Sequence, residues 1–379
     1  MASGRNTSIS IAKGIAIILM VAGHAECPGT LMSLIYIFHM PLFFITAGYF
    51  FSRRNVEQPW DYCCKRFKGL YVPFVKWSLF FLLIHNVMFQ VGILNETYGN
   101  WEGGVTHPYT MTQALQRVVH IFTAMAGYDE FLAGAFWFFR ALLITSILFL
   151  VLFSLVDSHT RRLKGWHIAA LISLAAIGFA ALRISYGLKV VNVVQGGIRE
   201  TWGMLFFGIG VVYRHFEQTR GFNPRHWGYW AAMTAAVAIL VAGTMNHWAG
   251  MNLSPKIRDV ATLPLTGMAG FFVTHQISRL IDSREWWLKR VLVHCGDMTL
   301  YIYVFHIISF KVVSMMKIAY YGLDPRQIGC HMVIHDHHDD LFWILYTIAG
   351  VALPLLWMWG YRHLKARIYS LSGATFRQQ

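Results

Sequence analysis

The sequence predicts an all-α, polytopic membrane protein with about ten transmembrane helices, and three observations support this fold class. Hydrophobic residues make up 56% of the 379 residues and charged residues only 13%, about half of the charged share of a soluble domain. The apolar residues gather in runs close to the roughly 20 residues that a helix needs to cross a bilayer. The lysines and arginines lie mainly in the short segments between these runs.

Ten apolar runs define the expected helices. The fifth and sixth runs are short for a full crossing, so one of them is expected to be tilted or re-entrant. The mixed segment at 110–127 is expected to lie in the membrane interface or to dip into it. No polar segment is long enough for a soluble domain, so a single membrane domain is expected over 1–379. The runs are 9–25, 32–51, 70–93, 131–156, 167–183, 198–213, 228–245, 258–281, 291–315 and 340–361.

The distribution of basic residues predicts the orientation. When the N-terminus is placed in the cytoplasm, most lysines and arginines fall in cytoplasmic segments, as the positive-inside rule requires. Both termini are therefore expected in the cytoplasm, with the protein in the inner (plasma) membrane. This rule also accounts for the net charge of +14. Nucleic-acid binding is not expected, because such proteins concentrate basic charge on a soluble face.

The first predicted helix carries two ionisable residues on one stripe. Eleven residues separate Lys13 from His24, which returns the helix to nearly the same face about 16 Å further along. Ionisable groups within a bilayer usually mark a functional pathway. Lys13 would hold a phosphate-bearing donor at the cytoplasmic mouth, and His24 would take a proton from an attacking hydroxyl. A snorkelling lysine and a helix-capping histidine would give the same pattern.

Two further features follow the first predicted helix along the chain. His39 comes just before Pro41, which loosens the second helix, and such a break is tolerated where it lines a cavity. A histidine packed beside a proline kink is the structural alternative. The basic cluster Lys65, Arg66 and Lys68 would bind coenzyme A phosphates, or it serves only as a determinant of topology.

Five sequence elements occur in order along the whole chain. The first is the basic-x10-His signature from Lys13 to His24. The others are a Phe-His-x-Pro element, a basic run before Leu-x-x-Pro-Phe, an aromatic element, and a late Gly-x-x-Thr-Leu-x-Ile-Tyr-x-x-His element. The residues of these elements are Ile11-Ala12-Lys13-Gly14-Ile15, Phe38-His39-Met40-Pro41-Leu42-Phe43-Phe44, Leu70-Tyr71-Val72-Pro73-Phe74, Ala135-Phe136-Trp137-Phe138-Phe139 and Cys295-Gly296-Asp297-Met298-Thr299-Leu300-Tyr301-Ile302-Tyr303-Val304-Phe305-His306. Together they resemble the acyltransferase-3 family of integral membrane acyltransferases, and more narrowly its fucose 4-O-acetylase-like branch.

The resemblance implies transfer of an acyl group, usually acetyl, from cytoplasmic acyl-CoA to a hydroxyl of an extracytoplasmic carbohydrate. Acetyl-CoA would be a donor substrate, with no permanently bound cofactor and no metal. Lys13 would orient the donor, and Arg66 and Lys68, with their neighbour Lys65, would contact coenzyme A. Lys13 and Lys68 stand where many members carry arginine, and a lysine lacks the bidentate fork of arginine.

On the catalytic side, the resemblance implies that His24 is the base, that His39 and Trp137 shape the site, and that His306 lines the pocket or touches the substrate. Direct attack of the hydroxyl on the thioester is expected, with Glu26 or another carboxylate orienting His24. No Gly-x-Ser-x-Gly element is present to suggest a serine nucleophile. An acyl-histidine intermediate remains an alternative route.

Other functions stay open at this stage. A transporter or flippase for a glycan-lipid or small solute would also carry intramembrane charges and a broken helix. The outer run from His331 to Asp340 is rich in histidine and aspartate, which suits a zinc or haem protein as well as an ordinary polar loop. The outer loops near 94–130 and 316–340 combine polar and aromatic residues suited to a carbohydrate acceptor. A disulfide between Cys27 and Cys330 would form in an oxidising outer compartment.

Overall fold

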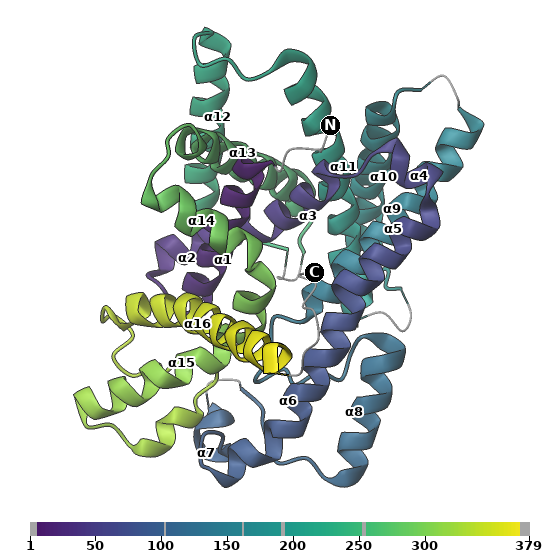
Figure 1. Ribbon diagram of the computed structural model, residues 1–379. Helices are drawn as coiled ribbons and strands as arrows, with labels where there is room; N and C mark the ends of the chain where they lie inside the picture. The colour runs from purple at the N-terminus through teal and green to yellow at the C-terminus, as the bar shows by residue number, and fades with distance from the viewer. Residues whose placement is uncertain (1–5, 102–103, 161–162, 191–193, 252–254, 372–379) are drawn as a thin grey trace.

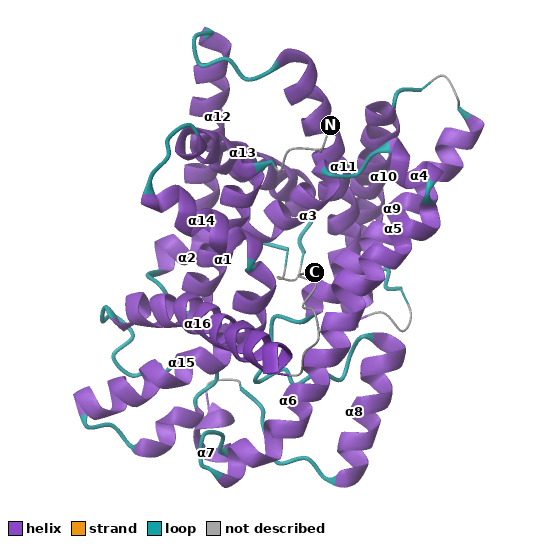
Figure 2. Ribbon diagram, viewed as in Figure 1, coloured by secondary structure: helices purple, strands orange, loops and turns teal. Residues whose placement is uncertain are grey.

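The computed structural model describes residues 6–101, 104–160, 163–190, 194–251 and 255–371, and this part of the chain is helical without strands (Figures 1 and 2). The elements are α1 (Thr7–His24), α2 (Gly29–Tyr36), α3 (His39–Tyr49), α4 (Arg53–Glu57), α5 (Pro59–Arg66), η1 (Phe67–Tyr71), α6 (Val72–Gln90), α7 (Glu96–Gly99), α8 (Met111–Ala124), α9 (Trp137–His159), α10 (Gly165–Tyr186), η3 (Val194–Gly197), α11 (Ile198–Arg220), α12 (Trp227–Met245), α13 (Asp259–Asp282), α14 (Trp287–Asp297), α15 (Thr299–Tyr321), η4 (Pro325–Gly329) and α16 (Phe342–Leu371).

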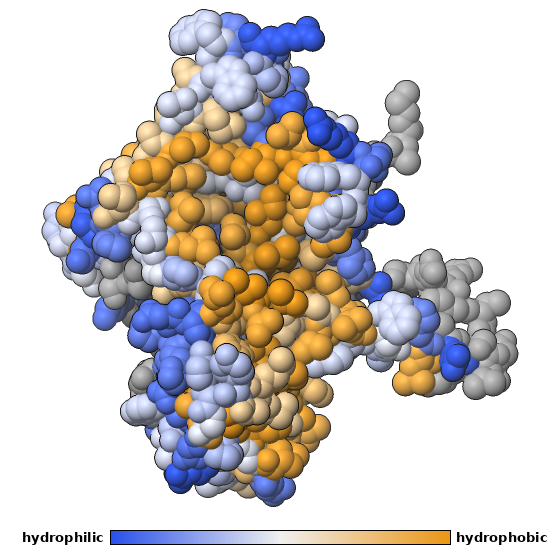
Figure 3. Space-filling view, turned by 90° about the vertical axis from the view of Figure 1, so that its left-hand side faces the viewer, coloured by the Kyte–Doolittle hydropathy of each residue, from blue (hydrophilic) through white to orange (hydrophobic). Residues whose placement is uncertain are grey.

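Eight helical segments of the described chain are long and apolar enough to cross a membrane, and they coincide with eight of the ten expected runs. The protein is therefore a multi-pass membrane protein. The count of ten is not reached, because the runs at 198–213 and 258–281 form α11 and α13, helices of 23 and 24 residues that contain polar and charged side chains and are not among the eight apolar segments. Figure 3 shows a broad apolar area on one face, with hydrophilic residues gathered toward the top and bottom.

Two expected helices are divided. The run at 32–51 forms α2 and α3, separated by Ile37 and Phe38, so the break falls a few residues before Pro41. The run at 291–315 divides at Met298 into α14 and α15. A continuous apolar pattern does not reveal such a turn, because both flanking pieces remain helical and apolar.

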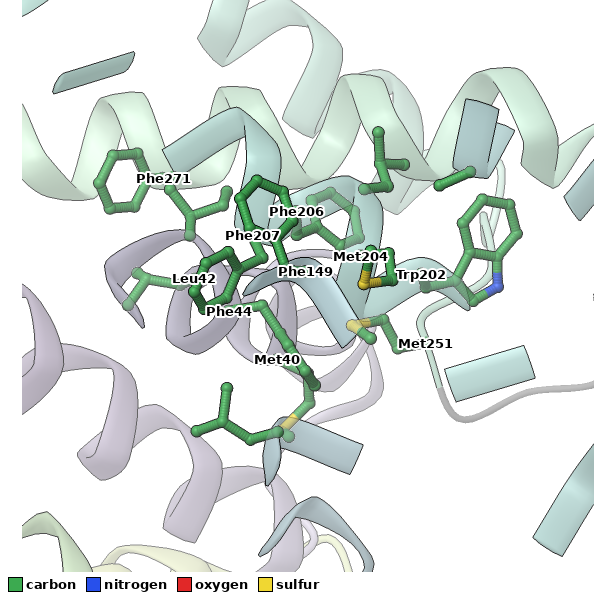
Figure 4. Packing of buried hydrophobic residues seen from close by; sticks show 14 of the residues in the cluster. Met40, Leu42, Phe44, Phe149, Trp202, Met204, Phe206, Phe207, Met251 and Phe271 are labelled. Atoms are coloured by element: carbon green, nitrogen blue, oxygen red, sulfur yellow. The ribbon is translucent and has the colours of Figure 1, made fainter. Parts of the chain in front are cut away.

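Glycines bring the central helices into close contact. A side chain at Gly48 of α3 would collide with the backbone of Phe207 in α11, and one at Gly14 of α1 would collide with the carbonyl of Leu292 in α14. Small residues at such points let two backbones approach within a membrane. Beside the α3–α11 contact, Phe44 packs among Phe149, Phe206 and Phe207 (Figure 4).

A chain of hydrogen bonds fixes the relative direction of α1, α3 and α11. Asn6, at the start of α1, donates to Tyr49 Oη at the end of α3 (3.1 Å), and Tyr49 donates to Glu217 near the end of α11 (2.6 Å). The opposite ends of these three helices, at His24, His39 and Ile198, consequently share the other side of the bundle. We call these two sides the Asn6 end and the His24 end.

Candidate functional site

The predicted site residues converge on one cavity. A cavity of about 320 Å³ lies between α1, α3, α5, η1, α9 and α15, and its lining is mostly apolar. Five of the predicted residues line it: Lys13, His24, His39, Arg66 and Trp137. These five side chains are up to 124 positions apart in the sequence.

His24 pairs with His306, which is fully buried in α15. The Nδ1 atom of His24 lies 2.8 Å from Nε2 of His306, and the two rings are stacked with their centroids 5.0 Å apart. On its far side, His306 places Nδ1 2.9 Å from the backbone carbonyl of Tyr303. His306 therefore contacts His24 and not the cavity directly, since the residues that line the cavity include His24 but not His306.

This chain of contacts fixes the tautomers of the two neutral rings. A carbonyl oxygen only accepts hydrogen bonds, so Nδ1 of His306 carries a proton and donates to Tyr303. Nε2 of a neutral His306 is then an acceptor, which requires His24 to donate from Nδ1. The remaining nitrogen of neutral His24, Nε2, has no proton and is available as a base.

His39 is held in the same manner. Its Nδ1 lies 2.8 Å from the carbonyl of Ile35 in α2, so the side chain bridges the break between α2 and α3. The proton on Nδ1 leaves Nε2 as an acceptor. The cavity is therefore bordered by two histidines, each with one unprotonated ring nitrogen.

The basic cluster divides into one residue at the cavity and two outside it. Arg66 lines the cavity together with Gly69 and Leu70, and its guanidinium lies 5.0 Å from the ring centroid of Tyr62. Lys65 and Lys68 are exposed and do not line the cavity. The π-helical turn η1 directly follows Arg66; such turns often occur at functional sites, and the sequence pattern had not revealed this one.

Glu26 does not contact His24. Its carboxylate accepts a hydrogen bond from Nδ1 of His335 (3.0 Å) in the loop before α16, and its backbone has a φ of 55°. The structure therefore pairs His24 with His306, where the sequence had suggested a carboxylate. Tyr303 is a lining residue that sequence reasoning missed, and its hydroxyl donates to the carbonyl of Ala135.

The structure also bears on the expected disulfide and on the alternative of a metal site. Cys27 is a buried free thiol, so the predicted bridge to Cys330 is not formed. Within the described ranges, no three His, Cys, Asp or Glu side chains come together as a metal site. In the outer run from His331 to Asp340, the carboxylate of Asp336 accepts a hydrogen bond from Gln327, and the carboxylate of Asp340 forms an ion pair with Lys317 (3.1 Å).

Comparison with known proteins gives one match. The model of the acyltransferase-3 family, described as an acyltransferase domain, matches residues 6–363. The matched region includes every residue that lines the cavity. No curated protein and no solved structure matches the chain.

Proposed function

The chain belongs to the acyltransferase-3 family, and we propose that it transfers an acyl group, acetyl in the simplest case, from cytoplasmic acyl-CoA to a hydroxyl of an extracytoplasmic carbohydrate. The protein would act in the inner (plasma) membrane with both termini in the cytoplasm. The observation that carries the proposal is the hydrogen-bond chain from Tyr303 through His306 to His24, which leaves His24 Nε2 unprotonated beside a cavity.

His24 acts as the base in this mechanism. Its Nε2 takes the proton of the acceptor hydroxyl as the oxygen attacks the thioester carbonyl, and the carbonyl π electrons move onto its oxygen. When the tetrahedral intermediate collapses, the C–S bond breaks and the thiolate of coenzyme A takes the proton from His24. His306 holds the Nδ1 proton of the imidazolium throughout, so the ring keeps its orientation.

The length of the cavity suits an acyl-CoA donor. Lys13 and His24 both line it and lie about 16 Å apart along α1. Lys13 and Arg66 would hold the phosphates of coenzyme A toward the Asn6 end. The thioester then reaches His24, with His39 and Trp137 around the reacting groups.

The transporter alternative loses support. Its evidence was the broken second helix and the intramembrane charges, and both features now belong to the cavity of a protein from an acyltransferase family.

The test uses His24→Asn, because the amide of asparagine keeps a donor near the position of Nδ1 but has no Nε2. Membranes that contain the wild-type protein should consume radiolabelled acetyl-CoA and incorporate label into glycans. His24→Asn should lower this rate about 10²-fold to 10⁴-fold, the usual contribution of a general base. His363→Asn, an exposed histidine in α16, serves as the matched control. A fully active His24→Asn variant at equal abundance would exclude the mechanism, and no acetyl-CoA consumption by the wild type would exclude acetyl-CoA as the donor.

A further inference from the structure

Arg199 lies beside Trp137 at the His24 end, next to the cavity but not among the residues that line it. It occupies the first turn of α11, and its guanidinium carbon is 4.2 Å from the ring centroid of Trp137. Trp137 itself lines the cavity. A guanidinium stacked on an indole in this way is held in place while the edge of its plane remains free to donate hydrogen bonds.

The neighbouring charged groups are engaged elsewhere. The adjacent Glu200 accepts two hydrogen bonds from Arg140 of α9, at 3.1 and 3.3 Å. Arg183 of α10 donates to the hydroxyl of Thr201 and to two backbone carbonyls. The one carboxylate of this group is therefore paired with Arg140, and the three arginines give the region an excess of positive charge.

Arg199 has unused hydrogen-bonding capacity. Its Nε is buried without a hydrogen-bond partner, and so is Oε2 of Glu200, so the two groups do not satisfy each other. A buried donor without a partner is unfavourable. Because Nε is buried, an oxyanion would bind the two terminal nitrogens of the guanidinium, which donate no hydrogen bond to another described residue, and it would balance part of the local charge.

The position of Arg199 separates it from the expected donor phosphates. Gly210 of α11 faces the carbonyl of Ile45 and the backbone of Tyr49, so the later part of α11 lies toward the Asn6 end. Arg199, three turns earlier on the same helix, lies at the His24 end. Lys13 and Arg66 are the cations that line the cavity nearer the Asn6 end.

We propose that Arg199, stacked on Trp137, binds a carboxylate or phosphate on the acceptor, so that the enzyme prefers an acidic carbohydrate over a neutral one. This inference rests on the proposed function in one respect, because it assigns the His24 end of the cavity to the acceptor. The bound anion holds the sugar beside Trp137, where aromatic and cationic groups together orient the ring and present a hydroxyl to His24.

The test compares two matched pairs of probes on the full-length protein in phosphatidylcholine nanodiscs. Methyl β-glucuronide is compared with methyl β-glucoside, and glucose 6-phosphate with glucose, by calorimetric titration. The wild type should bind at least one anionic probe about tenfold or more tightly than its neutral partner, as expected for a charge-assisted hydrogen bond. Arg199→Gln should reduce this preference to about twofold or less, whereas Arg220→Gln, an exposed arginine at the other end of α11, should retain it.

Arg199→Lys controls for folding, because it keeps the charge and should retain part of the preference. Equal affinity for the charged and neutral probes, or a preference that survives in Arg199→Gln, would overturn the inference. Loss of the preference in phosphatidylglycerol nanodiscs would also overturn it, because the site would then bind a lipid headgroup. A change in selectivity between succinyl-CoA and acetyl-CoA, with no change for the sugars, would assign the anion to the donor and likewise overturn it.

Release of coenzyme A, measured in the same samples, separates the two proposals. If the neutral glucoside accelerates release as well as the glucuronide does, the acyltransferase stands and the acidic acceptor is excluded. If the glucuronide binds in an Arg199-dependent manner but no sugar accelerates release, the anion site stands and the proposed transfer reaction fails.

Discussion

The Nδ1 atom of His24 lies 2.8 Å from Nε2 of His306, although 282 positions separate the two residues. The carbonyl of Tyr303 at the other end of the pair sets the direction of both hydrogen bonds. In many hydrolases a carboxylate orients the catalytic histidine. Here a second histidine, buried in α15, is the partner of the proposed base, so the pair adds no negative charge within the membrane.

The proposed donor site predicts different effects for substitutions of Lys13 and Lys68. Lys13→Met should raise the KM for acyl-CoA about tenfold with a smaller effect on kcat, because it removes a charge-assisted contact to phosphate. Lys13→Arg should stay near the wild type. Lys68→Met is the control, because Lys68 is exposed and does not line the cavity. Initial rates of coenzyme A release at several donor concentrations measure this, and an equal rise in KM for Lys68→Met would contradict the assignment.

The glycine contact between α3 and α11 predicts a large loss of stability from a single methyl group. Gly48→Ala should lower the free energy of unfolding by about 1–3 kcal/mol or more, because the added carbon meets the backbone of Phe207. Gly178→Ala in α10 is the matched control, since nothing lies within 4 Å of its added carbon. That variant should be neutral or more stable by about 0.5–1 kcal/mol. Thermal unfolding in detergent compares the two, and similar melting temperatures would argue against the tight α3–α11 contact.

His331, in the loop before α16, predicts a loss of stability in mild acid. Burial lowers the pKa of His331 below its usual 6.5, and the charge of Lys311 lowers it further. Asp129 and the backbone of Glu130 act in the opposite direction, while His335 adds to the lowering. The folded state therefore binds fewer protons than the unfolded state just below pH 6.5, so stability is present above this pH and is lost as the pH falls toward the folded pKa.

The measurement is the thermal midpoint between pH 7.5 and pH 5. His331→Asn should reduce the drop in the midpoint over this range, because asparagine does not titrate. A variant with the same drop as the wild type would show that other groups cause the acid sensitivity.

The sequence predicted which residues line the cavity better than it predicted which side chains contact one another there. Helical spacing placed Lys13 and His24 on one face of α1, and the proline after His39 indicated a break at a cavity, because both features are local. The partner of His24 is not local, and spacing within one helix does not say which helices will meet. The carboxylate of Glu26 was assigned by proximity in sequence, but a left-handed backbone at this residue begins the turn after α1 and the side chain pairs with His335.

The polar first turn of α11, which contains Arg199, is a second case in which contacts between helices do not follow from the sequence of one helix. The run at 198–213 is short for a membrane span and begins with Arg199 and Glu200, and in the structure Arg140 pairs with Glu200 while Arg199 stacks on Trp137. These partners come from α9, some sixty positions earlier. Only the packing of α9 against α11 brings them together.

A double-mutant cycle on the histidine pair tests the central claim most directly. The rate of acetyl transfer is measured for the wild type, His24→Asn, His306→Gln and the double variant, with protein abundance and melting temperature as controls. His306→Gln alone should lower the rate about 10-fold to 100-fold, the usual effect of removing a residue that orients a functional side chain. Because His306 acts only through His24, the double variant should be no slower than His24→Asn by more than about twofold. Losses that multiply in the double variant would show that the two histidines act independently and would contradict the proposed hydrogen-bonded base.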